Sequence, residues 1–438
     1  MTNLLMQIAG PAGWLRSVLP QSISDSVVYD VIWPLIQIAV ALFIVMTLVA
    51  YLTLAERKIS AWIQSRMGPM RVGPWGLLQP AADGLKLLIK EDIIPLLADK
   101  AVFTIAPIVS MVAAITVLVI IPYGAGWAPI TDVNIALLFI LAFSSVGTLG
   151  IILGGWASNS KYPLLGALRS SAQMISYEVA MGLALIGPLM WSKTLSMVGI
   201  VNAQNGDHIW YVFYQPLGFL IYFVCALAET NRAPFDLPEA ESELTGGFHT
   251  EYSGFRFSLY FIAEYAAMFT VSAIAVTVFL GGWDFGGLIG HFLANTHQNV
   301  YTVISIIVFF GKVLLLLWAF MWFRWTFPRY RYDQLMDVGW KWLIPASLAN
   351  IVLTGVWFVI GISIPDGKPF LKNYGTYIAA PGFPAKAYVI GSAFLVTITL
   401  TAILLSSINK HSRDFNLRTQ RQLQLQKRAE RLAEAGNM

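Results

Sequence analysis

The stretch VIWPLIQIAVALFIVMTLVAYLTL, residues 31–54, runs for 24 residues without a charged side chain. An α-helix of about 20 apolar residues is long enough to cross the hydrocarbon core of a bilayer, which is about 30 Å thick. Only 12% of the whole chain is charged, where a soluble domain carries roughly a quarter. Further apolar runs follow at 101–121, 135–155, 173–191, 211–228, 257–280, 301–323, 343–364 and 387–408. The sequence therefore predicts an all-α fold, a polytopic membrane helix bundle.

Cysteine and histidine usage limits the chemistry that the chain can perform alone. Cys225 is the only cysteine, so the chain can form neither an internal disulfide nor an iron–sulfur cluster. All five histidines lie outside the apolar runs, so a buried bis-histidine haem site is excluded. We expect no metal, no cofactor chelated by or covalently bound to this chain, and no nucleic-acid partner. Electrons for any redox reaction would have to come from a partner.

The basic residues predict the orientation of the spans. Of the 28 Lys and Arg, 22 fall in connections and the C-terminal tail on one side, 5 fall on the other side, and Lys312 lies within a span. The positive-inside rule places the larger group in the cytoplasm. We therefore expect a periplasmic N-terminal segment over 1–30 and a cytoplasmic C-terminus.

The first cytoplasmic connection contains a predicted amphipathic helix over 75–90. On a helical wheel one face holds the apolar residues Leu77, Leu78, Ala81, Leu85, Leu88 and Ile89, while Gln79, Asp83 and Lys86 gather on the other. Such a helix would lie in the plane of the membrane, with one face against lipid or protein. The segment before it, from Arg57 to Trp75, contains glycine and proline breaks and is predicted to be an ordered loop.

Three charged residues lie within the predicted spans, Glu178, Glu264 and Lys312. Each costs roughly 2.5–3.5 kcal/mol on insertion scales, and such residues usually face the interior of a bundle. A carboxyl in a low-dielectric interior can be neutral or charged near neutral pH, which favours a proton path. The alternative is a purely structural ion pair between Glu178 and Lys312.

The segment 229–251 contains six of the chain's 24 acidic residues, and these are Glu229, Asp236, Glu239, Glu241, Glu243 and Glu251. Crowded carboxylates raise one another's pKa values and titrate as a coupled set, which suits proton handling. An exposed loop that docks a basic partner is the other interpretation. A site for a hard cation is a weaker third one.

Four longer strings point to a known family. They are AERKISAWIQSRMGPMRVGPWGLLQPAADGLKLLIKED from Ala55, LLGALRSSAQMISYEVAMG from Leu164, AETNRAPFDLPEAESEL from Ala228 and FPRYRYDQLM from Phe327. Together they resemble the family of H-type membrane subunits of bacterial NADH:quinone oxidoreductase, respiratory complex I. The resemblance covers about residues 30–364.

The resemblance implies a subunit of a proton-pumping translocase that is not catalytic alone. In that family the subunit lies where the peripheral electron-transfer arm joins the membrane arm, forms much of the quinone chamber and begins a charged path toward the pumping subunits. It implies a bacterial inner-membrane location, quinone as substrate, and NADH, FMN and iron–sulfur clusters on partner subunits. The implied partners are the cluster-bearing subunits of the peripheral arm, small neighbouring membrane subunits and lipids.

Position by position, the motifs and the buried charges give two sets of site residues. The set expected at the quinone chamber or a partner interface is Glu56, Arg57, Arg66, Asp83, Lys86, Glu91, Arg169, Gln173, Arg232, Arg324, Arg329, Arg331 and Asp333. The set expected on the proton path is Glu178, Glu229, Asp236, Glu239, Glu241, Glu243, Glu264 and Lys312.

The family has eight spans, which implies an eight-span core over 31–364 followed by an extra loop and a ninth span over 365–408. The basic tail over 409–438 has a net charge of +4. It either clamps the peripheral arm or anionic lipid, or is a dispensable appendage.

Two other functions remain open from the sequence. A homologous subunit of a membrane-bound hydrogenase or ferredoxin-driven complex shares this fold, but would be favoured only if Arg66 were missing or the acidic loop eroded. A secondary cation transporter normally has repeated halves and discontinuous spans, and the sequence indicates neither.

Overall fold

The structure is a computed structural model, and it describes residues 32–125, 133–207, 209–236, 246–284 and 298–363, with residues 395, 398, 399, 402 and 406. The regular elements in these ranges are helices. Six of them are long and apolar enough to cross a membrane. The predicted all-α, polytopic helical membrane fold is therefore confirmed.

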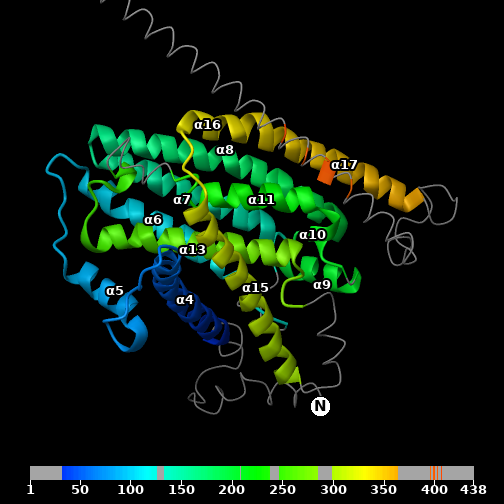
Figure 1. Cartoon of the computed structure of the whole chain (residues 1–438), viewed down its shortest axis with the longest axis horizontal. Coiled ribbons are helices and arrows are strands. Elements are labelled where there is room, and N and C mark those ends of the chain that lie inside the picture. Colours follow the sequence, from blue (N-terminus) through cyan, green and yellow to red (C-terminus); the bar gives the residue numbers. More distant parts are fainter. Residues whose placement is uncertain are drawn as a thin grey trace, which may run out of the picture. The chain divides into compact units, whose positions relative to one another are not determined.

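The elements follow one another along the chain as labelled in Figure 1. The helices are α4 (Trp33–Ile63), α5 (Gln79–Ile89), α6 (Lys100–Leu118), α7 (Ala136–Ala157), α8 (Lys161–Ser192), α9 (Met197–Asp207), α10 (Tyr211–Tyr214), α11 (Pro216–Glu229), α13 (Gly254–Phe279), α15 (Gln298–Thr326), α16 (Tyr332–Val338) and α17 (Ile344–Ser363). The single turns are η2 (Pro74–Gly76), η3 (Gly247–His249) and the π-helical η4 (Gly339–Leu343).

Several predicted boundaries differ from the observed ones. Helix α4 continues nine residues beyond the predicted end of the first span, and α8 begins twelve residues before the predicted start of the fourth. The predicted span 211–228 is broken into α10 and α11. Because α11 has 14 residues at 1.5 Å each, it is too short to cross the hydrocarbon core.

Some predictions fall on residues that the structure does not describe. They are the N-terminal segment 1–30, Glu239, Glu241 and Glu243 of the acidic loop, nearly all of the ninth span 387–408, and the tail 409–438. The chain divides into two compact units, and the larger one, Met1–Val212 with Gly218–Gly355, contains every site residue discussed below.

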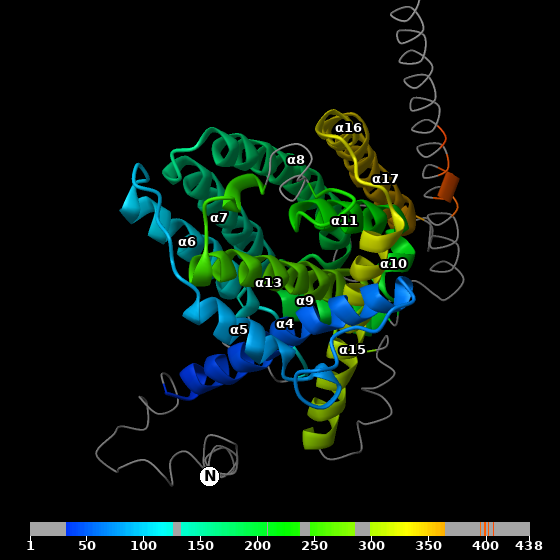
Figure 2. The same ribbon diagram turned by 60° about the vertical axis from the view of Figure 1, so that its left-hand side comes forward.

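Helix α13 is the interior helix of the larger unit. It packs against α4, α5, α6, α8, α9 and α15. Figure 2 shows it running between α4 and α5 on one side and α7 and α8 on the other. In its most apolar window, 78% of the helix is buried, against 24–44% in the other five candidate spans. Residues on opposite sides of α13 can therefore face different internal spaces.

Two glycines allow α7 to approach its neighbours closely. A Cβ atom at Gly150 would collide with Ser110 of α6, and one at Gly154 would collide with the Tyr260 hydroxyl of α13. Small residues four positions apart let the backbones of membrane helices come together. As a result α7 packs closely against α6 and approaches α13 at Gly154.

The predicted amphipathic helix is present, but it is shorter than expected. Helix α5 covers Gln79–Ile89, preceded by η2. Its polar face is fastened to α4, because Arg57 Nη1 lies 2.7 Å from Asp83 Oδ2. The opposite face is turned outward, with Leu88 and Ile89 62% and 77% exposed. The loop predicted from Arg57 onward is wrong at its start, because Arg57 to Ile63 are helical.

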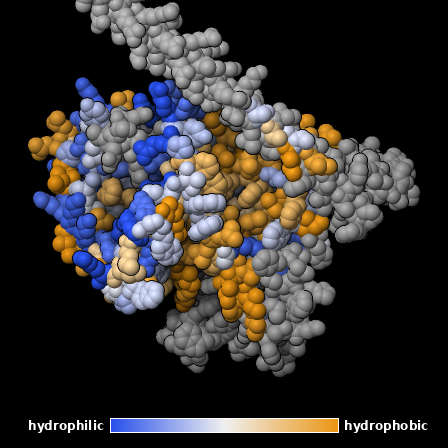
Figure 3. All heavy atoms as spheres, viewed as in Figure 1, coloured by the Kyte–Doolittle hydropathy of each residue, from blue (hydrophilic) through white to orange (hydrophobic). Residues whose placement is uncertain are grey.

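Polar and apolar side chains are separated on the surface of the larger unit. In the view of Figure 3, hydrophilic side chains gather toward the end where α5 and the first turns of α6, α8 and α13 lie. Hydrophobic side chains cover most of the long helices beyond them. This distribution is typical of a helix bundle embedded in lipid with one polar end.

Candidate functional site

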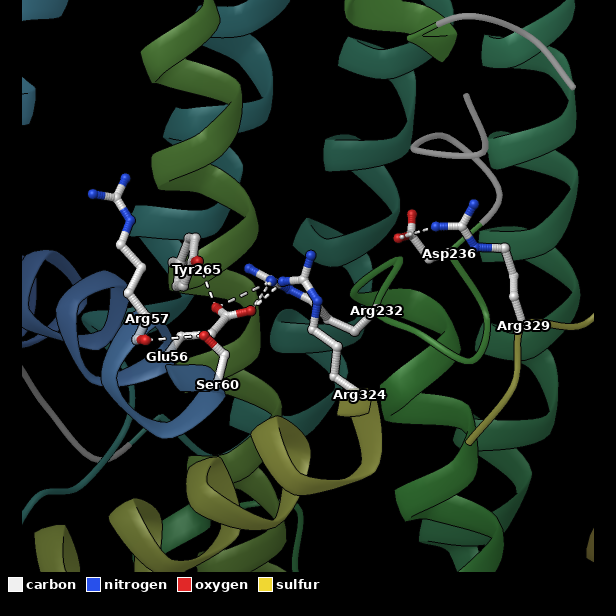
Figure 4. A network of polar contacts seen from close by, with 8 residues as sticks. All are labelled: Glu56, Arg57, Ser60, Arg232, Asp236, Tyr265, Arg324 and Arg329. Atoms are coloured by element: carbon white, nitrogen blue, oxygen red, sulfur yellow. Dashed lines mark hydrogen bonds and ion pairs between the residues drawn. The ribbon is translucent and has the colours of Figure 1, made fainter. Parts of the chain in front are cut away.

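A buried ion-pair cluster joins four distant parts of the sequence (Figure 4). The Glu56 carboxylate, on a residue that is 6% exposed, accepts hydrogen bonds from Arg232 Nη1 at 3.1 Å, from Arg324 Nη1, and from the Tyr265 hydroxyl at 2.6 Å. The Arg232 guanidinium also lies 4.3 Å from the centre of the Tyr265 ring. These four residues, Glu56, Arg232, Tyr265 and Arg324, are called the Glu56 cluster below.

The charges of the Glu56 cluster explain why α4 does not end where its apolar run ends. A carboxylate within a helix bundle is costly unless it is paired and hydrogen-bonded. Glu56 forms ion pairs with two guanidinium groups, those of Arg232 and Arg324, so the cluster has a net charge of one positive unit. Burial disfavours the charged form of Arg232, but Glu56, Tyr265 and Glu264 hold the pKa of this residue above its ordinary value.

The Glu56 cluster borders a cavity of about 660 Å³. We call it the lateral cavity. Side chains from α4, α5, α13 and α15 form its walls. Its polar side includes Glu56, Arg57, Asp83, Lys86, Tyr265 and Arg324, and its apolar side includes Met46, Val49, Leu87, Phe261 and Ile262. The cavity therefore combines a charged end with an apolar wall.

A second cavity, of about 110 Å³, lies among α6, α7, α8, α11 and α13. We call it the inner cavity. Glu229 and Glu264 line it together with Ser144. The hydroxyls of Ser144 and Ser145 donate to Glu178 Oε1 at 3.0 and 2.5 Å, and Glu178 interacts electrostatically with Glu229. Two carboxyl groups thus line this small space, and a third, that of Glu178, bonds to Ser144 on its wall.

Helix α13 separates the two cavities. Phe257 and Phe261 line both of them. Glu264 lines the inner cavity, whereas the next residue, Tyr265, lines the lateral cavity and donates to Glu56. Successive helical residues point about 100° apart, which allows one turn of α13 to serve both spaces.

The described part of the acidic loop is held by the segment before α16. Arg329 Nη2 lies 3.4 Å from Asp236 Oδ2, as Figure 4 shows. The Tyr330 amide donates to the Pro234 carbonyl at 3.1 Å, and the Tyr330 ring stacks on Phe235. These contacts bring two of the predicted motifs together.

Other predicted site residues line neither cavity. Arg66 and Glu91 are exposed, and the Arg66 side chain bonds to Gln64. Arg331 and Asp333 form an exposed pair 3.9 Å apart. Arg169 lies over the Tyr332 ring at 5.6 Å. In the part of the chain that the structure describes, no group of three or more His, Cys, Asp or Glu is placed to hold a metal ion.

The proposed ion pair between Glu178 and Lys312 is wrong. Glu178 is bonded to the two serines of α7, whereas Lys312 Nζ donates to the carbonyls of Leu280, Gly282 and Asp284 at 2.7, 2.9 and 2.6 Å. Leu280 caps the C-terminal end of α13, where a cation is stabilised by the helix dipole, and the other two carbonyls follow in the chain. Lys312 therefore fastens α15 to α13 and contributes to neither cavity.

Sequence reasoning missed Tyr265, Ser144 and Ser145. A tyrosine directly after Glu264, and two adjacent serines in an otherwise apolar span, are the only local signals. Such residues are common in membrane helices, so the signals are weak. Their importance becomes visible only when the partners Glu56 and Glu178 are placed beside them.

Comparisons with known proteins agree with this arrangement of motifs. The family model described as NADH dehydrogenase matches residues 36–355. The NADH-quinone oxidoreductase H subunit numbered 1 in Cytophaga hutchinsonii is 47% identical over 332 residues, which cover 74% of this chain and 96% of the relative.

The H subunit numbered 1 in Geobacter sulfurreducens is 49% identical, with 73% of this chain and 92% of the relative covered. The H subunit numbered 2 in Rhizobium meliloti is 48% identical, with 74% and 96% covered. These relatives favour complex I over the hydrogenase and transporter alternatives. The chain belongs to the H-subunit family of NADH-quinone oxidoreductase, respiratory complex I, as a multi-pass membrane subunit that is not catalytic alone.

Proposed function

We propose that this subunit forms the quinone-binding chamber together with the peripheral arm, and that it couples quinone reduction to proton translocation through buried carboxylates. The observation that carries the proposal is the Glu56 cluster, of which Glu56, Tyr265 and Arg324 line the lateral cavity. The second half is supported by the inner cavity, which Glu229 and Glu264 line, and by Glu178, which bonds to Ser144 on its wall.

The lateral cavity has the size and polarity that a quinone requires. Its volume of about 660 Å³ falls within the range of roughly 300–1,000 Å³ that is usual for small-molecule sites. The apolar wall suits an isoprenoid tail. Quinone carbonyls accept hydrogen bonds and gain negative charge when electrons arrive, so the excess positive charge of the Glu56 cluster stabilises the reduced forms.

Quinone reduction also takes up two protons, and the inner cavity is adjacent to the place where they are consumed. Arg232 interacts electrostatically with Glu56 and also with Glu264, which lines the inner cavity. A change of charge in the lateral cavity therefore changes the electrostatic potential at the carboxyl groups of Glu178, Glu229 and Glu264. Asp236 and the acidic residues after it extend this proton path at the loop.

The remaining assignments follow from the family and from the charge distribution. Electrons come from NADH through FMN and iron–sulfur clusters on the peripheral subunits, since the chain's one cysteine, Cys225, cannot hold a cluster. The 22 to 5 distribution of basic residues supports a periplasmic N-terminus and a cytoplasmic C-terminus in the bacterial inner membrane. The core ends near residue 364, and the ninth span and tail are an addition to it.

The variant Glu56→Gln tests the chamber directly. It keeps the shape of the side chain but removes the charge that balances Arg232 and Arg324. In the assembled complex in membrane vesicles, we expect quinone turnover to fall by at least about tenfold, while NADH oxidation by ferricyanide is unchanged.

The control is Asp337→Asn, which removes an exposed carboxylate that pairs with Lys341 at 2.8 Å. Asp337 lines neither cavity, and we expect wild-type quinone turnover. Normal quinone kinetics in an assembled Glu56→Gln complex would refute the chamber.

A further inference from the structure

We propose that Gln173 is a positioning residue that sets the turn 228–235, so that Arg232 of this turn reaches Glu56 on the wall of the lateral cavity and Glu229 faces the inner cavity. The inference rests on the proposed function of the two cavities. It assigns Gln173 a role other than lining the chamber, since Gln173 is 0% exposed and lines neither cavity.

The turn begins where α11 ends. The amide of Arg232 donates to the Leu227 carbonyl at 3.2 Å, and the amide of Asn231 donates to Ala228 at 3.2 Å. Asn231 has φ of 47°, in the left-handed region that often terminates a helix. This reversal separates two charged residues of the same turn. Glu229 lines the inner cavity, and Arg232 bonds to Glu56 beside the lateral cavity.

Gln173 of α8 fastens both ends of this turn. Its Nε2 donates to the carbonyl of Ala228 at 2.7 Å and to the carbonyl of Phe235 at 2.7 Å. A side-chain amide has two N–H groups, so both donors are used and the two carbonyls are held at a fixed separation. The segment between them contains Glu229 and Arg232.

Neighbouring residues on the same face of α8 support the turn at single points. The Ser170 hydroxyl donates to Asn231 Oδ1 at 3.3 Å, Met174 Sδ lies 3.7 Å from Asn231 Nδ2, and the Tyr177 ring packs against Phe235. Positions 170, 173, 174 and 177 lie on one side of a helix. Among these four, Gln173 alone is bonded to both ends of the turn.

Because Glu229 and Arg232 belong to one turn, a displacement of the turn moves both charges together. The next residue along α8 after Tyr177 is Glu178, which accepts a hydrogen bond from Ser144 and interacts electrostatically with Glu229. Gln173 therefore fixes the distance of Arg232 from Glu56 and, at the same time, that of Glu229 from the Ser144–Glu178 pair. The expected consequence of losing it is a change in coupling between quinone reduction and pumping.

The test is Gln173→Met, which keeps the length of the side chain and removes both donors. The chain offers a matched control in Gln204→Met. Gln204 is also 0% exposed, and its Nε2 donates to the carbonyls of Thr277 and Val278 at 2.9 and 3.2 Å. It accepts two amide hydrogen bonds as well, so its loss removes more bonds, but it lines neither cavity.

Both variants are measured as intact complex in membrane vesicles, with the amount of complex normalised by NADH oxidation with ferricyanide. For Gln173→Met we expect quinone kcat to fall by about tenfold and the number of protons pumped per NADH to fall as well. For Gln204→Met we expect both quantities to be unchanged per assembled complex. A general loss of stability would instead affect Gln204→Met at least as strongly.

A double-mutant cycle shows whether Gln173 acts through Arg232. We expect Arg232→Lys to lower kcat less in the Gln173→Met background than in the wild type, whereas in the Gln204→Met background the two effects multiply. If Gln173→Met does not assemble, Gln173→Asn keeps the amide but is one carbon too short to bridge both carbonyls. For Gln173→Asn we then expect a smaller fall in the number of protons pumped per NADH.

An unchanged proton ratio in an assembled Gln173→Met or Gln173→Asn complex overturns the inference, as do multiplicative effects with Arg232→Lys. These outcomes are separate from the chamber test. If Glu56→Gln is impaired and Gln173→Met is normal, only the positioning role fails. If Glu56→Gln is normal, the proposed function itself fails.

Discussion

At the scale of single residues, the Glu56 cluster shows how a carboxylate is retained in a membrane protein. Two guanidinium groups and one hydroxyl satisfy Glu56, and the Tyr265 ring covers Arg232. Removing one partner of a buried ion pair typically costs about 3–5 kcal/mol, because the other charge is left uncompensated. Residues that bond to Glu56 are therefore expected to be sensitive to substitution.

Tyr265→Phe removes one hydrogen bond to Glu56 and keeps the aromatic ring that packs against the Arg232 guanidinium. A hydrogen bond to a charged group is worth about 1.5–3 kcal/mol, so we expect quinone turnover to fall by about tenfold or more in an assembled complex. Tyr123→Phe is the control, since Tyr123 is also buried, donates to the Leu118 carbonyl at 2.6 Å and lines neither cavity. Equal loss in both variants would contradict a specific role for Tyr265.

Glu264→Gln keeps the shape of a half-buried side chain at the inner cavity and removes its ability to release a proton. We expect proton pumping linked to quinone reduction to fall by at least about tenfold, with electron transfer from NADH to ferricyanide intact. The measurement is the initial rate of vesicle acidification per assembled complex. Full acidification at normal quinone turnover would remove Glu264 from the proton path.

The motifs identified most charged residues of the site, but they could not identify the contacts between them. Glu56 and Arg232 are 176 positions apart, and nothing local to Glu56 indicates which cation will reach it. Similarly, Lys312 and Glu178 both lie within spans, which made an ion pair plausible. In the structure Lys312 instead donates hydrogen bonds to three backbone carbonyls. Every residue has a backbone carbonyl, so the sequence does not indicate which of them will accept such a bond.

At the scale of elements, hydropathy located the helices and misplaced their ends. The apolar run of α4 stops before Glu56, but the helix continues because tertiary partners satisfy its charges. Helix α8 likewise begins well before its apolar run, with Arg169 lying over Tyr332 and Gln173 bonded to the turn after α11. Helix boundaries that depend on contacts with distant residues cannot be read from a local window.

Helix α5 is fastened to α4 by the pair of Arg57 and Asp83, whose side chains are 51% and 30% exposed. Exposed pairs contribute about 0–1 kcal/mol, so we expect Arg57→Ala to lower quinone turnover by no more than about fivefold. The effect should diminish when ionic strength is raised, because salt already screens the pair in the wild type. A loss as large as that of Glu56→Gln would mean that Arg57 has a role beyond holding α5.

At the scale of the whole molecule, length and composition were enough to predict the fold class. Runs of about 20 apolar residues with few charges are explained by a helix that crosses a bilayer. The same criterion overestimated the span 211–228, because it counts apolar residues and does not detect the break between α10 and α11. The position of Pro216 at the start of α11 and the short length of this helix become meaningful only with the bundle around it.

The C-terminal tail is expected to matter through its charge. Residues 409–438 carry seven basic and three acidic side chains, and each basic group near an anionic surface contributes about 1 kcal/mol. If the tail clamps the peripheral arm or lipid, truncation after Ile408 should cause the arm to dissociate at moderate ionic strength while the core remains inserted. Gel analysis of the complex at increasing salt measures this, and unchanged salt sensitivity would make the tail dispensable.

The main proposal is that the lateral cavity is the quinone chamber. Labelling the intact complex with a photoreactive quinone tests this proposal most directly. After digestion, mass spectrometry identifies the labelled peptides of this chain. The account predicts label on cavity-lining residues of α4, α13 and α15, such as Met46, Ile262 and Trp325, and loss of that label when excess quinone competes. Competable label confined to helices that do not line the lateral cavity would contradict the account.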